Sequence, residues 1–177
     1  RLTLPKERVT REVMEFLAAR LQAILIERDV PADLVEAALS VDAERVADAG
    51  KRAEALAVFR READFTELAV AFKRVIRILP KGFSGSVDPR RFVSSAERAL
   101  HGEATTLRAE TAHLVQAGDY ARALQLIAAI RPIVDMFFEE VLVMAEDRDL
   151  QDNRLAILKE VADLFCGIAN FSKVTAS

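Results

Sequence analysis

The spacing of apolar residues limits what this chain can fold into more than any other feature of it. Apolar side chains recur three or four residues apart along most of the sequence, with charged residues between them, as in Val13, Leu17, Leu21 and Ile24. This period matches the 3.6-residue turn of an α-helix and not the two-residue alternation of a half-buried strand. Ala, Leu, Glu and Arg, which favour helices, dominate the composition. The sequence therefore predicts an all-α fold.

Four helices are predicted before residue 80. Asp29-Val30-Pro31 ends the first helix, because proline cannot extend a preceding helix yet suits the first turn of the next one. A short second helix follows. Asp42 and Asp64 are expected to cap a third and a fourth helix, since their side-chain oxygens can accept a hydrogen bond from a free backbone N–H group. The segment 80–86 contains proline, two glycines and two serines, and is predicted to be an exposed loop.

Three further helices are predicted after that loop. Asp88-Pro89 supplies an N-cap and an initial proline for a long fifth helix that continues to about Gln116. Gly118-Asp119 is expected to end this helix and to cap a sixth, so that the two helices form an antiparallel hairpin. The sixth helix is expected to reach Met144, with apolar residues on more than one face and a kink or break at Pro132. A last helix then follows.

The length and composition are those of a single domain. Residues 1–177 are predicted to form one bundle of about six to seven helices, because 51% of the 177 positions are hydrophobic and such a chain can bury its own core. No apolar run approaches the roughly 18 residues of a membrane span, and the first residues lack the apolar core of a signal peptide. We therefore expect a cytoplasmic protein with no membrane partner. The lack of an initiator Met indicates a fragment or a processed product.

The sequence lacks the motifs of catalysis and cofactor binding. His101 and His113 are twelve residues apart and have no further His or Cys at metal-sharing spacing. The loop Gly82–Ser86 ends without the glycine of a nucleophile elbow and without the Gly-Lys-Ser/Thr of a phosphate loop. The single cysteine, Cys166, is expected to be a buried spectator thiol on a core helix. We expect no catalytic residue, no metal and no cofactor in this chain.

Basic residues gather in one stretch of an otherwise acidic chain. The formal net charge is −3, but residues 73–91 hold one carboxylate, Asp88, and six cations: Lys73, Arg74, Arg77, Lys81, Arg90 and Arg91. The stretch thus carries +5, which leaves −8 on the rest. The first three cations are adjacent or three to four residues apart, so the fourth helix can present them together, beside the loop that holds Lys81 and Phe83.

Such a surface suits RNA. Arginine offers a planar fork to phosphate or guanine, and an exposed aromatic ring stacks on an unpaired base. The alternatives are a merely solvated run of charge and a Phe83 ring that packs back on the core.

Several segments resemble one known family in order and spacing. Residues 71–79, AFKRVIRIL, resemble the lysine-arginine-valine helix in the C-terminal region of the bacterial glycyl-tRNA synthetase beta subunit. Further resemblances follow in the same order: DYARAL (119–124), VDMFF (134–138), VLVMAED (141–147) and NRLAIL (153–158). The resemblance covers essentially the whole chain.

The resemblance implies a helical anticodon-binding domain of the DALR type, similar to that of arginyl-tRNA synthetases. In this family the alpha subunit activates glycine with ATP and Mg, and the beta subunit supplies tRNA recognition within an alpha-beta hetero-oligomer. The chain would then bind the anticodon stem-loop of tRNA(Gly). Catalysis by the intact glycine–tRNA ligase would lie elsewhere, so that this fragment alone is non-catalytic.

The RNA contacts that the resemblance implies are Lys73, Arg74 and Arg77, with Asn153 and Arg154 second. Arg77 stands where related sequences commonly place asparagine, which weakens the case for a specific base contact. Asn153 has an alternative role as the N-cap of the last helix. Arg154 has one as a surface ion-pair partner of Asp149 or Asp152.

The main alternative function is a helical protein–protein adaptor of the tetratricopeptide type. Gly118-Asp119-Tyr120 followed by Ala123 resembles the hairpin of such a repeat. However, no second copy lies about 34 residues away, and these repeats need about three copies to bury a continuous core.

Overall fold

The computed structural model describes residues 6–41, 45–63 and 65–175. Over these residues the chain forms α-helices and two short 3₁₀ helices, with no strand, which confirms the predicted all-α bundle. The elements in chain order are α1 (Lys6–Glu27), α2 (Ala32–Leu39), α3 (Val46–Phe59), α4 (Phe65–Ile78), η1 (Pro89–Arg91), α5 (Ser95–Ala117), α6 (Tyr120–Ala128), α7 (Arg131–Glu140), α8 (Arg148–Cys166) and η2 (Phe171–Lys173).

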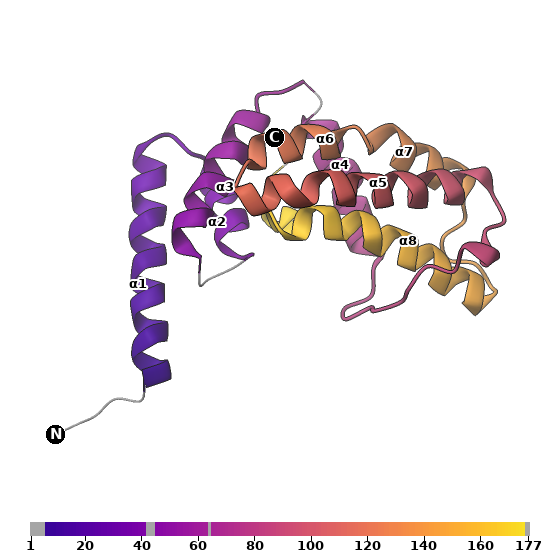
Figure 1. The fold of residues 1–177 in the computed structure, drawn as a ribbon, viewed down its shortest axis with the longest axis horizontal. Helices are drawn as coiled ribbons and strands as arrows, with labels where there is room; N and C mark the ends of the chain where they lie inside the picture. Colours follow the sequence, from indigo (N-terminus) through magenta and orange to yellow (C-terminus); the bar gives the residue numbers. More distant parts are fainter. Residues whose placement is uncertain (1–5, 42–44, 64, 176–177) are drawn as a thin grey trace.

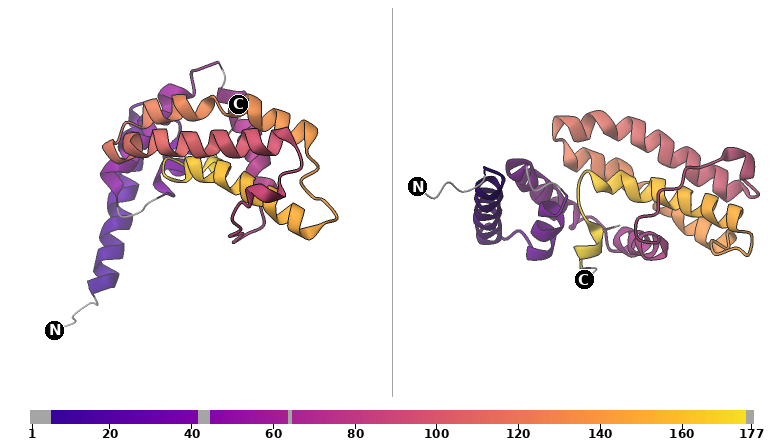
Figure 2. Two further views of the ribbon diagram at one scale, coloured as in Figure 1. Left: turned by 45° about the vertical axis from the view of Figure 1, so that its right-hand side comes forward. Right: turned by 90° about the horizontal axis from the view of Figure 1, so that it is seen from below.

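Helices α5, α6, α7 and α8 lie side by side roughly along the longest axis of the molecule, and α1 runs across that axis (Figure 1). Helix α5 packs on α6, α7 and α8, and α4 packs on α7, α8 and η2. At one end α3 joins α2 to this bundle through α6, and α1 projects from that end (Figure 2). Among residues 7–27 of α1, whose burial the structure describes, only Leu25 is buried, whereas Phe16 is 70% exposed. None of the described helices has the length and hydropathy that a membrane span requires.

The predicted start of the fifth helix is wrong. Asp88 does act as a cap, but its carboxylate accepts a hydrogen bond from the Arg90 backbone N–H and opens the short η1. Helix α5 begins at Ser95 with a reciprocal capping box: the Ser94 hydroxyl accepts from the Glu97 backbone, and the Glu97 carboxylate accepts from the Ser94 backbone. This box satisfies two free N–H groups at once, which makes it the stronger helix start.

The predicted sixth helix is divided near Pro132, as expected, but it ends earlier. Proline lies in the first turn of α7, and the chain leaves the helix at Val141, whose backbone is extended. From there burial alternates: Val141 and Val143 are buried, whereas Leu142 is 73% exposed and Met144 is exposed as well. This alternation belongs to an extended segment, so the helical prediction for residues 141–144 is wrong.

The caps predicted around the hairpin are confirmed. Gly118 ends α5 in the left-handed conformation, with a φ of 77°, and Asp119 caps α6 by accepting from the Arg122 backbone N–H. Helices α5 and α6 then pack together as the predicted hairpin. Asp42 and Asp64, the predicted caps of the third and fourth helices, lie outside the described residues.

We expect Asp147→Ala to lower the free energy of unfolding by about 0.5–2 kcal/mol. Asp147 caps α8 by accepting hydrogen bonds from the backbone N–H groups of Asp149 and Leu150, at 2.9 and 3.2 Å. Urea denaturation measures the change. Asp152→Ala is the matched control, because it removes an exposed carboxylate from the same helix without removing the cap, and it should change stability by no more than about 0.5 kcal/mol.

A candidate nucleic-acid interface on α4

Helix α4 separates apolar and basic side chains. It buries one face against the rest of the bundle, and the buried residues are Phe65, Leu68, Ala69, Ala71, Phe72 and Val75. On the other side Arg74 and Arg77 are exposed and Lys73 is partly exposed. The buried face therefore fixes the helix in a position from which its cations point outward.

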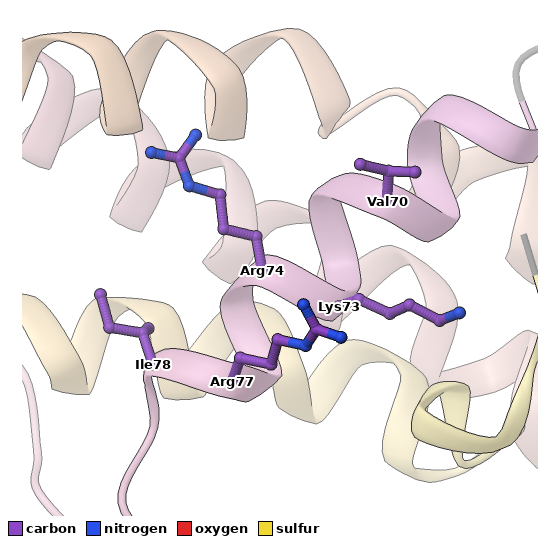
Figure 3. Close-up of a pocket in the computed structure, with 5 residues that line it drawn as sticks. All are labelled: Val70, Lys73, Arg74, Arg77 and Ile78. Carbon is purple, nitrogen blue, oxygen red and sulfur yellow. The ribbon is translucent and has the colours of Figure 1, made fainter.

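These three cations share one surface. Lys73, Arg74 and Arg77 line an open cavity of about 470 Å³ together with Val70 and Ile78. Figure 3 shows the three basic side chains around this opening. The Arg74 side chain extends up and to the left in this view, and the Lys73 side chain extends to the right. The prediction that their spacing would bring them together is confirmed. We call Lys73, Arg74 and Arg77 the α4 cation cluster.

The charges of the α4 cation cluster are not neutralised by any residue that the structure describes. Arg74 places its guanidinium 4.0 Å from the centre of the Phe138 ring on α7, which orients the side chain and leaves its charge unpaired. Neither Lys73 nor Arg77 forms an ion pair or a side-chain hydrogen bond within the described ranges. Three positive charges are therefore available to a ligand.

The second half of the basic stretch behaves differently. Arg90 and Arg91 both pair with Asp88, at 2.9 and 3.6 Å, and Arg91 also reaches Asp149 at 3.0 Å. The hydrogen bond from Arg90 lowers the pKa of the Asp88 carboxyl group. The sequence balance of +5 thus overstates the free charge, which is concentrated on α4.

The loop after α4 contributes one exposed cation and one packed ring. Lys81 is exposed, with no ion pair to any described residue. Phe83 is partly buried and packs against the core, so the structure shows the core-packing alternative. Gly85 lies directly beside the ring: a Cβ atom there would be 2.5 Å from Cζ of Phe83. The close approach explains why glycine occupies this position.

Asn153 does not cap the last helix; Asp147 does. Asn153 is buried in α8, where its amide oxygen accepts from the Asp88 backbone N–H at 2.7 Å and its amide nitrogen donates to the Asp88 carbonyl at 3.2 Å. Both hydrogen-bonding groups are occupied by one backbone unit. Asn153 therefore anchors the segment before η1, apart from the α4 cation cluster.

Arg154 pairs with neither Asp149 nor Asp152, so the expected surface ion pair is wrong. Its Nε donates to Glu97 at 2.7 Å and its Nη1 donates to the Leu142 carbonyl at 2.8 Å, with only 8% of the residue exposed. Burial raises the pKa of Glu97, but the hydrogen bonds from Arg154 and from two backbone N–H groups outweigh it, so the pKa is lowered. Sequence reasoning missed Glu97, although Ser94-x-x-Glu97 is a recognisable capping box.

Cys166 is exposed at the end of α8, contrary to the expectation of a buried thiol. Partial burial of the sulfur and the nearby Asp163 carboxylate raise the pKa of this thiol, which disfavours the nucleophilic thiolate. Among the described residues, no group of three or more His, Cys, Asp or Glu side chains is arranged to hold a metal ion.

Comparison with models of protein families gives no match. Curated proteins do match: the glycine–tRNA ligase beta subunit of Citrifermentans bemidjiense is 40% identical over 173 residues, which are 98% of this chain. The subunits of the same name from Myxococcus xanthus and Desulforapulum autotrophicum are 41% and 42% identical over 93% and 96% of the chain. The chain spans about a quarter of the length of these relatives, 25%, 24% and 25%. Over nearly its whole length, the chain is therefore homologous to a segment that makes up about one quarter of the length of these glycine–tRNA ligase beta subunits.

Proposed function

We propose that this chain binds the anticodon stem-loop of tRNA(Gly) as part of a glycine–tRNA ligase beta subunit. The observation that carries the proposal is the α4 cation cluster, in which Lys73, Arg74 and Arg77 face one open cavity without a neutralising partner among the described residues. The names of the relatives support the choice of ligand, because they describe a ligase that joins glycine to tRNA.

The chemistry of the cluster fits an RNA hairpin. Arginine forks bind phosphate oxygens or guanine edges, and lysine adds a compact charge. Val70 and Ile78 place apolar surface between the cations, which suits the faces of sugars and unpaired bases. The rest of the molecule is acidic, with a net charge of −3 for the whole chain, so it repels a polyanion and directs it to α4.

The wider proposal concerns the intact enzyme. Residues 1–177 act as one anticodon-binding domain of the DALR type, which is non-catalytic by itself and binds no cofactor. The alpha subunit of the alpha-beta hetero-oligomer supplies the site that uses ATP and Mg to attach glycine in the cytoplasm. Identity of about 40% to beta subunits supports this assignment.

We expect Arg77→Ala to weaken binding of a tRNA(Gly) anticodon hairpin roughly tenfold, because a hydrogen bond to a charged group contributes about 1.5 kcal/mol. The salt dependence of log K should also fall by about one unit of slope, since one phosphate contact is lost. Fluorescence anisotropy across a series of salt concentrations measures both effects.

Arg108→Ala is the matched control, because Arg108 is an exposed arginine on α5 and does not line the cavity. It should leave affinity and slope unchanged. Equal binding by Arg77→Ala and Arg108→Ala would remove the physical basis of the proposal. Arg74→Ala is less clean, because it also removes the stacking on Phe138.

A further inference from the structure

A second cavity, of about 560 Å³, lies on the other side of α4 from the open surface described above. It is open to solvent and is lined by α4, the loop that follows α4, the C-terminal end of α8, η2 and residues Ser40 and Val41 at the end of α2. Its apolar lining includes the aromatic rings of Phe72, Phe83, Phe165 and Phe171 beside the aliphatic side chains of Ile76 and Leu79. The cavity is therefore a preformed apolar site of the size that ordinarily receives a small organic group.

The rim of this cavity carries polar and charged side chains, among them Lys81, Lys159 and Asp163. Lys81 lies at the rim without a partner among the described residues. Lys159 also lines the cavity and pairs with Asp163 through Nζ–Oδ distances of 2.6 and 2.7 Å. The pair sets a hydrogen-bond donor beside an acceptor. The edge of a nucleobase carries the same combination, whereas a phosphate would be repelled by the Asp163 carboxylate.

The cavity is next to the α4 cation cluster. A small cavity of about 130 Å³ is lined by Lys73, Ile76, Arg77 and Ser172. Ile76 lines both this small cavity and the apolar cavity. Lys73 and Arg77 thus lie on one side of Ile76, and the apolar cavity lies on the other side. One nucleic-acid strand can therefore contact both the cations and the cavity.

We propose that the apolar cavity takes one unpaired nucleobase from the RNA whose phosphates bind the α4 cation cluster. This inference rests on the proposed function and extends it from phosphate binding to base binding. Stacking on an aromatic ring is favourable for any base, and Phe83 places its ring in the cavity wall from the loop after α4. An apolar peptide side chain fits the lining less well, because the surrounding Lys73, Arg77 and Lys81 complement a polyanion.

The test fills the cavity without changing any charge. Ala162 lines the cavity on α8, and Ala162→Leu should lower affinity for the hairpin roughly tenfold, within the range attributed to one stacked base. The salt slope should stay that of the unaltered protein, because no phosphate contact is lost. Ala109→Leu, the same change at an exposed position of α5, is the control and should bind normally.

A hairpin with 2-aminopurine at each unpaired position in turn supplies a second readout. One position should change its fluorescence when the unaltered protein binds, and should not when Ala162→Leu binds. If Ala162→Leu melts early, Phe83→Leu replaces it, since that change removes the stacking ring and keeps an apolar wall.

Normal affinity of a folded Ala162→Leu or Phe83→Leu variant, with the same fluorescence change, would overturn the base-binding inference and leave phosphate binding by α4 intact. The same conclusion follows if Arg77→Ala loses affinity and the folded cavity variants do not. Failure of the unaltered chain to bind any hairpin would overturn both proposals.

Discussion

Replacing Arg154 with alanine should lower the free energy of unfolding by about 3–5 kcal/mol, the cost of leaving a buried charge without its partner. Glu97 has no exposed surface, and its carboxylate accepts from Arg154 at 2.7 Å as well as from the backbone N–H groups of Val93 and Ser94. The same substitution frees the Leu142 carbonyl. Urea denaturation at neutral pH measures the loss.

The pH dependence identifies the buried carboxylate as the cause. Because the folded-state pKa of Glu97 is lowered, its contribution to stability is present above the usual value of 4.5 and is lost as the pH falls through the folded-state value. Without Arg154, the folded-state pKa of Glu97 moves upward, because burial still raises it while the hydrogen bond and the charge of Arg154 no longer lower it, so the variant gains less stability as the pH rises. The gap between the two proteins should therefore narrow below about pH 4.5. A loss under 1 kcal/mol, or a gap independent of pH, would contradict the assignment.

The second large effect is expected from Phe137→Ala, at about 3–5 kcal/mol. Phe137 has no exposed surface, and its ring packs edge-on against Phe138 with a centre-to-centre distance of 5.9 Å. Truncation leaves a cavity between α7 and its neighbours. For a chain of this length the melting temperature should fall by roughly 6–20 °C.

Phe138→Ala provides the internal comparison on the same helix. Phe138 is only partly buried, and the Arg74 guanidinium covers one face of its ring. The substitution loses part of the apolar burial and one cation–π contact, together about 1–2 kcal/mol. Equal losses for Phe137→Ala and Phe138→Ala, measured by thermal melting, would show that the two rings are not buried as the structure has them.

The helices could be predicted from the sequence because their determinants are local. Apolar spacing and caps such as Gly118-Asp119 depend only on neighbouring residues. The prediction was wrong at two places, the start of the fifth helix and residues 141–144, because in each place the sequence also fits a second local structure. Asp88-Pro89 and Ser94-x-x-Glu97 both favour a helix start, and local reasoning cannot rank them. The apolar run 141–144 is compatible both with helical spacing and with an extended segment. In the structure it is extended, with its two valines buried.

In the candidate site, too, the features set by neighbouring residues could be predicted and those set by tertiary packing could not. Lys73, Arg74 and Arg77 lie on one helix, so their spacing alone was enough to place them together. The partners of Asn153 and Arg154 are 65 and 57 residues away in the sequence, and only tertiary packing brings them into contact. Some of the predicted polar site residues therefore lie on an open surface, whereas Asn153 and Arg154 are buried and hold the fold together. Residue type alone does not distinguish these two positions.

We propose that the α4 cation cluster holds the anticodon stem-loop of a glycine tRNA. The most direct measurement compares the affinities of the chain for two hairpins that differ only in their anticodons, one from tRNA(Gly) and one exchanged for another amino acid. We expect the glycine hairpin to bind at least roughly tenfold more tightly, since one correct base contact contributes about 1–3 kcal/mol. Simultaneous replacement of Lys73, Arg74 and Arg77 by alanine should abolish binding of both hairpins. Equal affinities for the two anticodons, or unimpaired binding by the triple variant, would show that the α4 cation cluster does not bind the anticodon stem-loop.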